Sequence, residues 1–176
     1  MRAAALIPLV WLAGAAAASP VDGVRALDAE LLRGDSATVV LQRRCAARHP
    51  GEAPTIRAIR LATVQKPPPP EATRILGGGL RYRRVHLACG NEILSEADNW
   101  YAPSRLTPEM NGALETTDTP FGIVVRPLGF HRRRLKDETL AGPAEVLRHA
   151  AVLVDRSGRP FAFVEETYTR AAVAAP

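Results

Sequence analysis

The sequence predicts a single α+β domain, in which an antiparallel sheet of about five to six strands packs against N-terminal helices. Three observations predict this fold class. Apolar residues recur at helical spacing near the N-terminus, apolar and polar residues alternate in several later segments, and glycine-containing turns join those segments in pairs. The length of 176 residues suits one domain with a hydrophobic core, and 47% apolar with 23% charged residues is ordinary for a globular chain.

Residues 1–19 have the layout of a secretory signal peptide. One positive residue, Arg2, precedes an apolar run, and small residues follow up to Ala18. The run is short for a membrane span. We therefore expect residues 1–19 to be cleaved, residues 20–176 to form the domain, and the protein to be exported, periplasmic or secreted, with no stable membrane span.

Two helices are expected next. The segment "PVDGVRALDAELLRGDS" (20–36) carries leucines at helical spacing and ends near Gly34. The segment "SATVVLQRRCAARH" (36–49) begins with a candidate cap, Ser36, and predicts either a second helix or a helix that leads into a strand.

The remaining elements are mainly strands. "TIRAIRLATVQ" (55–65) alternates like a strand, and "KPPPP" (66–70) ends it as a stiff loop. Residues 81–89 and 93–102 predict two strands joined by a Gly/Asn hairpin. A helix start follows at Thr107-Pro108-Glu109. The segment 146–173 predicts a long hairpin that turns at 155–158, and Phe161, Phe163 and Glu165 are expected to share one face of its last arm.

Composition excludes some classes of site and leaves others open. The formal charge of +5 attracts anions, but the basic residues are scattered without interleaved aromatics, so we expect no nucleic-acid binding. No His or Cys spacing resembles a metal site. Cys45 and Cys89 form either one disulfide or two buried thiols. Glu165 is either a buried carboxyl with a raised pKa, suited to proton donation, or a partner of an arginine in a cross-strand ion pair.

Four stretches, taken together, resemble the chorismate pyruvate-lyase family, whose fold is shared by ligand-sensing domains of bacterial transcription regulators. They are "LLRGDSAT" (31–38), "RYRRVHLACG" followed by "NWYAPSRL" (81–106), "TTDTPFG" (116–122) and "SGRPFAFVEETY" (157–168). Their order and spacing hold from about residue 27 to residue 173. The resemblance implies a chorismate lyase-like fold and a monomer.

The resemblance also implies a site and a reaction without a cofactor. The family's anion-binding arginine falls on Arg84 and its essential glutamate on Glu165, which makes these two the candidate catalytic residues. Further substrate contacts fall on Phe121 and Ala37. The implied reaction eliminates pyruvate from chorismate, a cyclohexadiene carboxylate, to give 4-hydroxybenzoate, as in ubiquinone biosynthesis. An arginine fork suits a carboxylate, and a protonated glutamate would assist departure of the enolpyruvyl group.

Two other functions stay open. The first is a non-catalytic module that binds a small aromatic carboxylate, and the second is an exported structural protein that keeps only the fold. The family's lyases are cytoplasmic, and this chain differs from their pattern at Ala37, where methionine is common, and at Phe121, where leucine is common.

Overall fold

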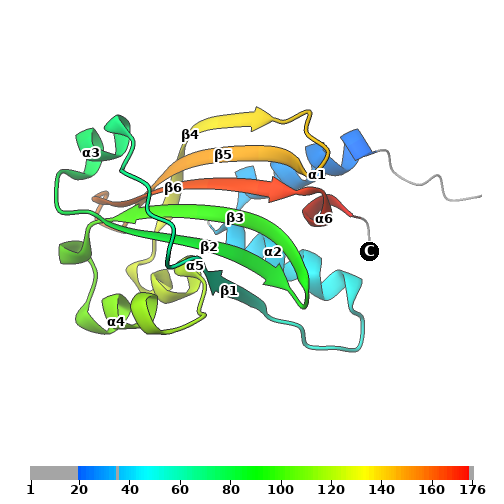
Figure 1. Cartoon of the computed structure of the whole chain (residues 1–176), viewed down its shortest axis with the longest axis horizontal. Helices are drawn as coiled ribbons and strands as arrows, with labels where there is room; N and C mark the ends of the chain where they lie inside the picture. Colours follow the sequence, from blue (N-terminus) through cyan, green and yellow to red (C-terminus); the bar gives the residue numbers. More distant parts are fainter. Residues whose placement is uncertain (1–19, 35, 175–176) are drawn as a thin grey trace, which may run out of the picture.

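Six strands in the described part of the chain form one antiparallel sheet, with helices on both of its faces (Figure 1). The structure is a computed structural model that describes residues 20–34 and 36–174, so the expected signal peptide at 1–19 lies outside it. The strands are β1 (Ile56–Arg60), β2 (Arg81–Cys89), β3 (Glu92–Tyr101), β4 (His131–Thr139), β5 (Glu145–Val154) and β6 (Pro160–Thr169). Their order in the sheet is β1-β2-β3-β6-β5-β4. The predicted α+β class is confirmed.

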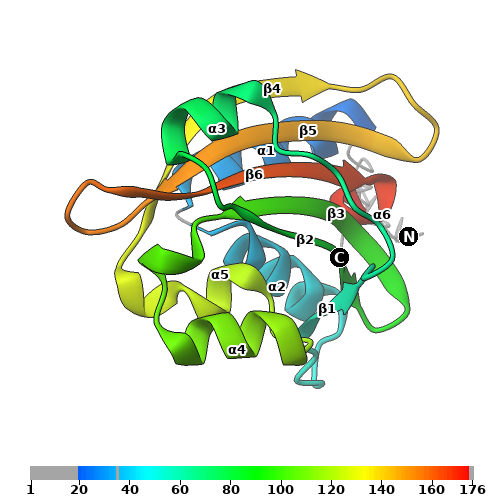
Figure 2. The same ribbon diagram turned by 60° about the vertical axis from the view of Figure 1, so that its left-hand side comes forward.

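The helices divide between the two faces (Figures 1 and 2). They are α1 (Pro20–Arg33), α2 (Ala37–Arg48), α3 (Pro70–Leu76), α4 (Pro108–Thr116), α5 (Phe121–Val124) and α6 (Arg170–Val173), with short 3-10 turns at Pro103–Arg105 and Arg126–Leu128. Both expected N-terminal helices form, and α4 begins as predicted. None of the helices within the described ranges is long and apolar enough to cross a membrane.

Cross-strand pairing defines the two faces of the sheet. On what we call the inner face, Val85 lies beside Ala97, and Ala97 beside Glu166. On the outer face, Arg84 lies beside Asp98, and Asp98 beside Glu165. Since side chains alternate along a strand, the two adjacent glutamates of β6 point to opposite faces.

Three apolar clusters hold the layers together. One packs α1, α2 and α6 on the inner face through residues such as Leu27, Leu41 and Tyr168. A second packs α4 and α5 on the other end of that face, around Phe121 and Phe161. The third packs α3 on the outer face, against the rings of Trp100 and Phe163 in the sheet.

The expectation that Phe161 and Phe163 share a face is wrong. Leu153 pairs with Ala162, but Val154 pairs with Pro160, so Phe161 is an extra residue on β6. Such a β-bulge disrupts the strict alternation of side chains. Phe161 therefore joins the inner-face cluster, while Phe163 packs against Trp100 on the outer face.

Four elements were not predicted from the sequence: α3, β4 and the short helices α5 and α6, of which α6 occupies the end of the arm expected to be strand. Helix α3 begins at Pro70, the last proline of the segment expected to be only a loop, because proline is acceptable in a first helical turn. Strand β4 contains the arginine-rich run 131–136 and forms one edge of the sheet.

The structure joins Cys45 of α2 to Cys89 of β2 in a disulfide. Both cysteines are buried in the first apolar cluster. Of the two alternatives that the sequence left open, the bridge is the one that the fold contains.

Candidate functional site

An interior cavity lies on the inner face of the sheet, where the first and second apolar clusters meet. The apolar part of its wall comes from both clusters: Val85, Leu87 and Ala97 on one side, and Phe121, Leu153 and Val164 on the other. The cavity volume is about 30 Å³. That is room for a water molecule or two, and much less than the roughly 150 Å³ that holds benzene.

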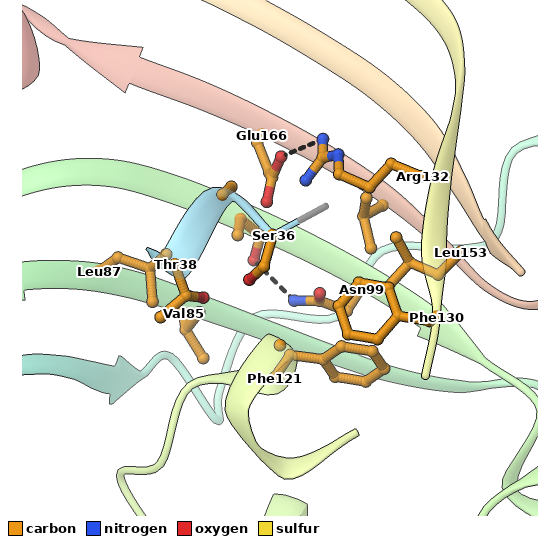
Figure 3. Close-up of a pocket in the computed structure, with 14 residues that line it drawn as sticks. Ser36, Thr38, Val85, Leu87, Asn99, Phe121, Phe130, Arg132, Leu153 and Glu166 are labelled. Atoms are coloured by element: carbon orange, nitrogen blue, oxygen red, sulfur yellow. Dashed lines mark hydrogen bonds and ion pairs between the residues drawn. The ribbon is translucent and has the colours of Figure 1, made fainter. Parts of the chain in front are cut away.

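A buried ion pair closes one end of the interior cavity (Figure 3). Arg132 of β4 donates to the Glu166 carboxylate of β6 across 2.6 Å, and each side chain is only 10% exposed. Burial alone would raise the pKa of Glu166, but the charge of Arg132 outweighs it and holds that pKa below its ordinary value. Glu166 is therefore ionised near neutral pH.

The ion pair belongs to a longer chain of buried polar groups. The Tyr168 hydroxyl donates to the same Glu166 oxygen at 2.9 Å. Next to it, the His149 ring stands edge-on to the Tyr168 ring and lies 2.8 Å from the Asp28 carboxylate of α1. Burial raises the pKa of the Tyr168 hydroxyl, and the Glu166 charge raises it further. Tyr168 is thus a fixed hydrogen-bond donor.

Three more polar side chains border the interior cavity: Ser36, Thr38 and Asn99 (Figure 3). The Ser36 hydroxyl is buried and has no hydrogen-bond partner among the described residues. Gly122 of α5 packs directly against it, since a Cβ there would lie 2.6 Å from the serine oxygen. The start of α2 and the start of α5 therefore meet over the cavity.

A second, larger hollow of about 430 Å³ lies on the outer face, and we call it the outer groove. Lys66 bridges two carboxylates there, at 2.9 Å from Asp98 and 2.8 Å from Glu165. Arg84 pairs with Glu96 and, at 3.6 Å, with Asp98. The groove is thus lined by charges that already neutralise one another.

The residues predicted from the sequence fall into two separate places. Ala37 and Phe121 line the interior cavity, whereas Arg84 and Glu165 line the outer groove. Glu165 is 29% exposed and paired, with Lys66 in place of the expected arginine. The structure therefore does not bring the four together.

A comparison with known proteins supplies one close relative. The chain is 40% identical over 175 residues to the uncharacterized protein y4mC of Sinorhizobium fredii (strain NBRC 101917 / NGR234). The alignment covers 83% of this chain and 73% of that protein. The chain belongs to the y4mC family. No protein-family model matches it.

Three solved structures resemble this y4mC-family chain distantly. The ligand-binding domain of a putative GntR-family transcriptional regulator from Bordetella bronchiseptica has a TM-score of 0.48 and 20% identity, over 67% of this chain and 85% of that one. The PhnF C-terminal domain has a TM-score of 0.44 and 14% identity, over 65% and 82%. The possible transcriptional regulator YydK from Bacillus subtilis has a TM-score of 0.44 and 18% identity, over 66% of this chain and 58% of that one. These scores carry no argument about function.

The interior ion pair of this y4mC-family chain was missed from the sequence because each partner sits beside a stronger signal. Counting five residues from Pro160 selects Glu165, but the bulge at Phe161 turns Glu166 inward instead. Arg132 stands in a run of three arginines that indicates a solvated face. Arg132 and Arg134 both pair with inner-face residues, Leu153 and Ala151, but the Arg132 side chain is 10% exposed and that of Arg134 is 46% exposed.

Metal ligands are not grouped in the part of the chain that the structure describes. No set of three or more His, Cys, Asp or Glu side chains is arranged there to hold an ion.

Proposed function

We propose that this protein binds a small aromatic carboxylate in the interior cavity and does not transform it. The observation that carries the proposal is the Arg132–Glu166 pair, buried at the end of an apolar cavity. A buried ion pair is at best a weak source of stability, so its presence suits a recognition role. Apolar walls with a few convergent polar groups are typical of small-molecule sites.

The chemistry of each group fits such a ligand. A guanidinium has five N–H donors, so a single short bond to Glu166 leaves donors for a ligand carboxylate. The ring would pack between Phe121 and Phe130, and the unpartnered hydroxyl of Ser36 would bond a ring substituent. Because the ligand-free cavity is small, binding requires the starts of α2 and α5 to separate.

A lyase reaction is the less favoured alternative. It needs a protonated glutamate close to an anion-binding arginine in an enclosed site. The interior glutamate, Glu166, has a lowered pKa. The pair implied by the family resemblance, Arg84 and Glu165, stands in the self-neutralised outer groove, where a substrate with two carboxylates meets four acids: Glu96, Asp98, Glu145 and Glu165.

Adjacent glutamates on opposite faces provide a matched test. We would titrate 4-hydroxybenzoate by calorimetry and thermal shift into the wild type, Glu166→Gln, Glu165→Gln and Arg132→Met, and assay each with chorismate by absorbance. We expect the wild type and Glu165→Gln to bind alike, Arg132→Met to bind at least about tenfold more weakly, and none to release 4-hydroxybenzoate.

Two results would contradict the proposal. Binding that is lost in Glu165→Gln or Arg84→Ala but kept in Arg132→Met would move the site to the outer groove, and turnover of chorismate sensitive to those residues would establish the lyase. Absence of both binding and turnover in the wild type would leave only a structural protein.

We also propose that the protein works in an oxidising compartment outside the cytoplasm. The buried Cys45–Cys89 bridge supports this, since such bonds persist mainly in exported proteins. The measurement is the intact mass of the protein recovered from periplasm and medium. Loss of about 19 residues with both thiols oxidised is expected, and full-length protein confined to the cytoplasm would refute the proposal.

A further inference from the structure

A third hollow, of about 180 Å³, opens at the edge of the sheet, and we call it the edge cavity. It exists because β1 accompanies β2 only as far as the Arg60–Val85 pair. One more hydrogen bond, from Leu61 N to Arg84 O, follows, and β2 residues before Arg84 have no strand beside them on that side. The volume is comparable to the roughly 150 Å³ that holds benzene.

Arg83 is a buried cation in the wall of the edge cavity. The residue is 5% exposed, and one Nη donates to the carbonyl oxygens of Thr117 and Thr119, both at 3.2 Å. Its Nε and other Nη have no hydrogen-bond partner, and no carboxylate of the described residues lies within 4 Å of it. Buried guanidinium groups are normally paired with an acid. Arg83 therefore lacks the partner that its burial requires.

Other positive charges converge on the same place. Arg60 is exposed, lines the edge cavity, and has no ion-pair partner in the described ranges. Burial lowers the pKa of Arg83 to about 10, and the nearby charge of Arg60 lowers it too. Burial raises the pKa of the Tyr101 hydroxyl, while three guanidiniums, those of Arg81, Arg83 and Arg60, counteract this. One hydroxyl and three cations thus lie close together in the wall of the edge cavity.

The acids nearby leave two of these charges uncompensated. Arg81 pairs with Glu115, the acid that lines the edge cavity. Arg84 is held by Glu96 and Asp98 in the outer groove. Asp118 acts on Arg83 through space but is not within ion-pair distance. Arg60 and Arg83 remain, which matches the charge of a dianion.

We propose that the edge cavity binds a small tetrahedral oxyanion of the phosphate type, either free or as the phosphoryl group of a larger molecule. Arg60 and Arg83 hold its oxygens through charge-assisted hydrogen bonds, the interaction in which arginine is strongest. The Tyr101 hydroxyl donates a further bond. This site lies beyond the end of β1 at one edge of the sheet, whereas the interior cavity lies on the inner face, so the proposal stands whether or not an aromatic carboxylate binds in the interior cavity.

The test compares two arginines of the same strand. Arg60 and Arg57 are both exposed residues of β1, but only Arg60 lines the edge cavity, because Arg57 points to the other face. Inorganic phosphate is titrated by calorimetry into wild type, Arg60→Gln and Arg57→Gln at constant ionic strength, since salt screens exposed charges. We expect Arg57→Gln to match the wild type and Arg60→Gln to bind at least about tenfold more weakly.

Further arms identify the ligand and protect the test from misfolding. Sulfate is expected to compete with phosphate, and acetate is expected to bind at least about tenfold more weakly, since it carries one charge. Arg83→Gln, checked for native circular dichroism, is expected to lose phosphate binding. Equal weakening in Arg57→Gln and Arg60→Gln, or no phosphate binding by the wild type, would overturn the proposal. Equal affinity for acetate would overturn the dianion assignment alone.

Discussion

Arg132 and Glu166 form a largely buried ion pair between strands β4 and β6. Each side chain is 10% exposed, and 2.6 Å separates the charged groups. Removal of one partner from a buried pair leaves an uncompensated charge, whereas replacement of both by apolar groups is often neutral. The pair is therefore strongly coupled.

We expect Arg132→Met alone to lower the free energy of unfolding by about 3–5 kcal/mol, and the double variant Arg132→Met/Glu166→Leu to recover most of it. The measurement is urea unfolding of both single variants and the double variant. Arg74→Met, which breaks an exposed pair with Glu71 on α3, is the control and should cost less than about 1 kcal/mol. Additive effects at Arg132 and Glu166 would refute the coupling.

The same pair predicts a dependence on pH. Since burial would raise the pKa of Glu166 but Arg132 keeps it below 4.5, the folded state binds the Glu166 proton less tightly than the unfolded state does. The stability that this gives is present above about pH 4.5 and is lost as the pH falls through the lowered pKa. Between about pH 5 and pH 3, the free energy of unfolding should therefore fall less in Glu166→Gln than in the wild type. Parallel curves would show that Glu166 titrates normally.

Which face a residue occupies was the least predictable property of the site. The strands β2, β3, β5 and β6 follow from alternation and turn residues, and the structure has them where they were expected. The extra residue at Phe161 reverses the face of the sheet that later β6 side chains occupy, relative to strict alternation from Pro160. Bulges of this kind carry no clear sequence signal. This is why the local pattern led to Glu165, while Glu166 faces the interior cavity.

At the scale of elements, α2 and α4 both follow a hydroxyl residue in extended conformation, but only α4 has a side-chain cap. The Thr107 side chain accepts a hydrogen bond from Met110 N at the start of α4. Ser36 precedes α2 in the same extended conformation, yet its hydroxyl makes no capping bond. The local sequence predicts a side-chain cap at both helices. The difference is that Ser36 packs against Gly122, a contact that the local sequence does not indicate.

We expect Thr107→Ala to lower the free energy of unfolding by about 1 kcal/mol, since it removes a cap. Ser36→Ala should change it by less than about 0.5 kcal/mol, because the buried hydroxyl has no hydrogen-bond partner in the part of the chain that the structure describes. Thermal unfolding of the two variants in one buffer measures both. A large loss in Ser36→Ala would mean that its hydroxyl bonds the backbone after all.

The two longest elements missed from the sequence, α3 and β4, share a cause. Helix α3 has seven residues after a run of prolines, and β4 pairs only with β5 at the sheet edge. Neither has the apolar period of a central element, because α3 buries just two side chains and β4 has none that is fully buried. Their structure depends on tertiary contacts that local patterns do not encode.

For the whole molecule, the disulfide links the helical layer to the sheet. Cys45 lies in α2 and Cys89 at the end of β2, 44 residues later along the chain. Closing a loop of that length in the unfolded chain is worth about 4 kcal/mol in the entropic account, and engineered removals generally cost about 2–5 kcal/mol. The bond thus contributes a large share of the stability of a domain this size.

We expect Cys45→Ala/Cys89→Ala to have a free energy of unfolding about 2–4 kcal/mol lower than the wild type and to unfold at a lower urea concentration. Dithiothreitol should shift the wild type to the same midpoint but leave the double variant unchanged. Because both sulfurs are buried, reduction in native buffer should be slow and should follow the rate of global opening. Rapid reduction without loss of structure would instead mean that α2 separates from β2 on its own, without global unfolding.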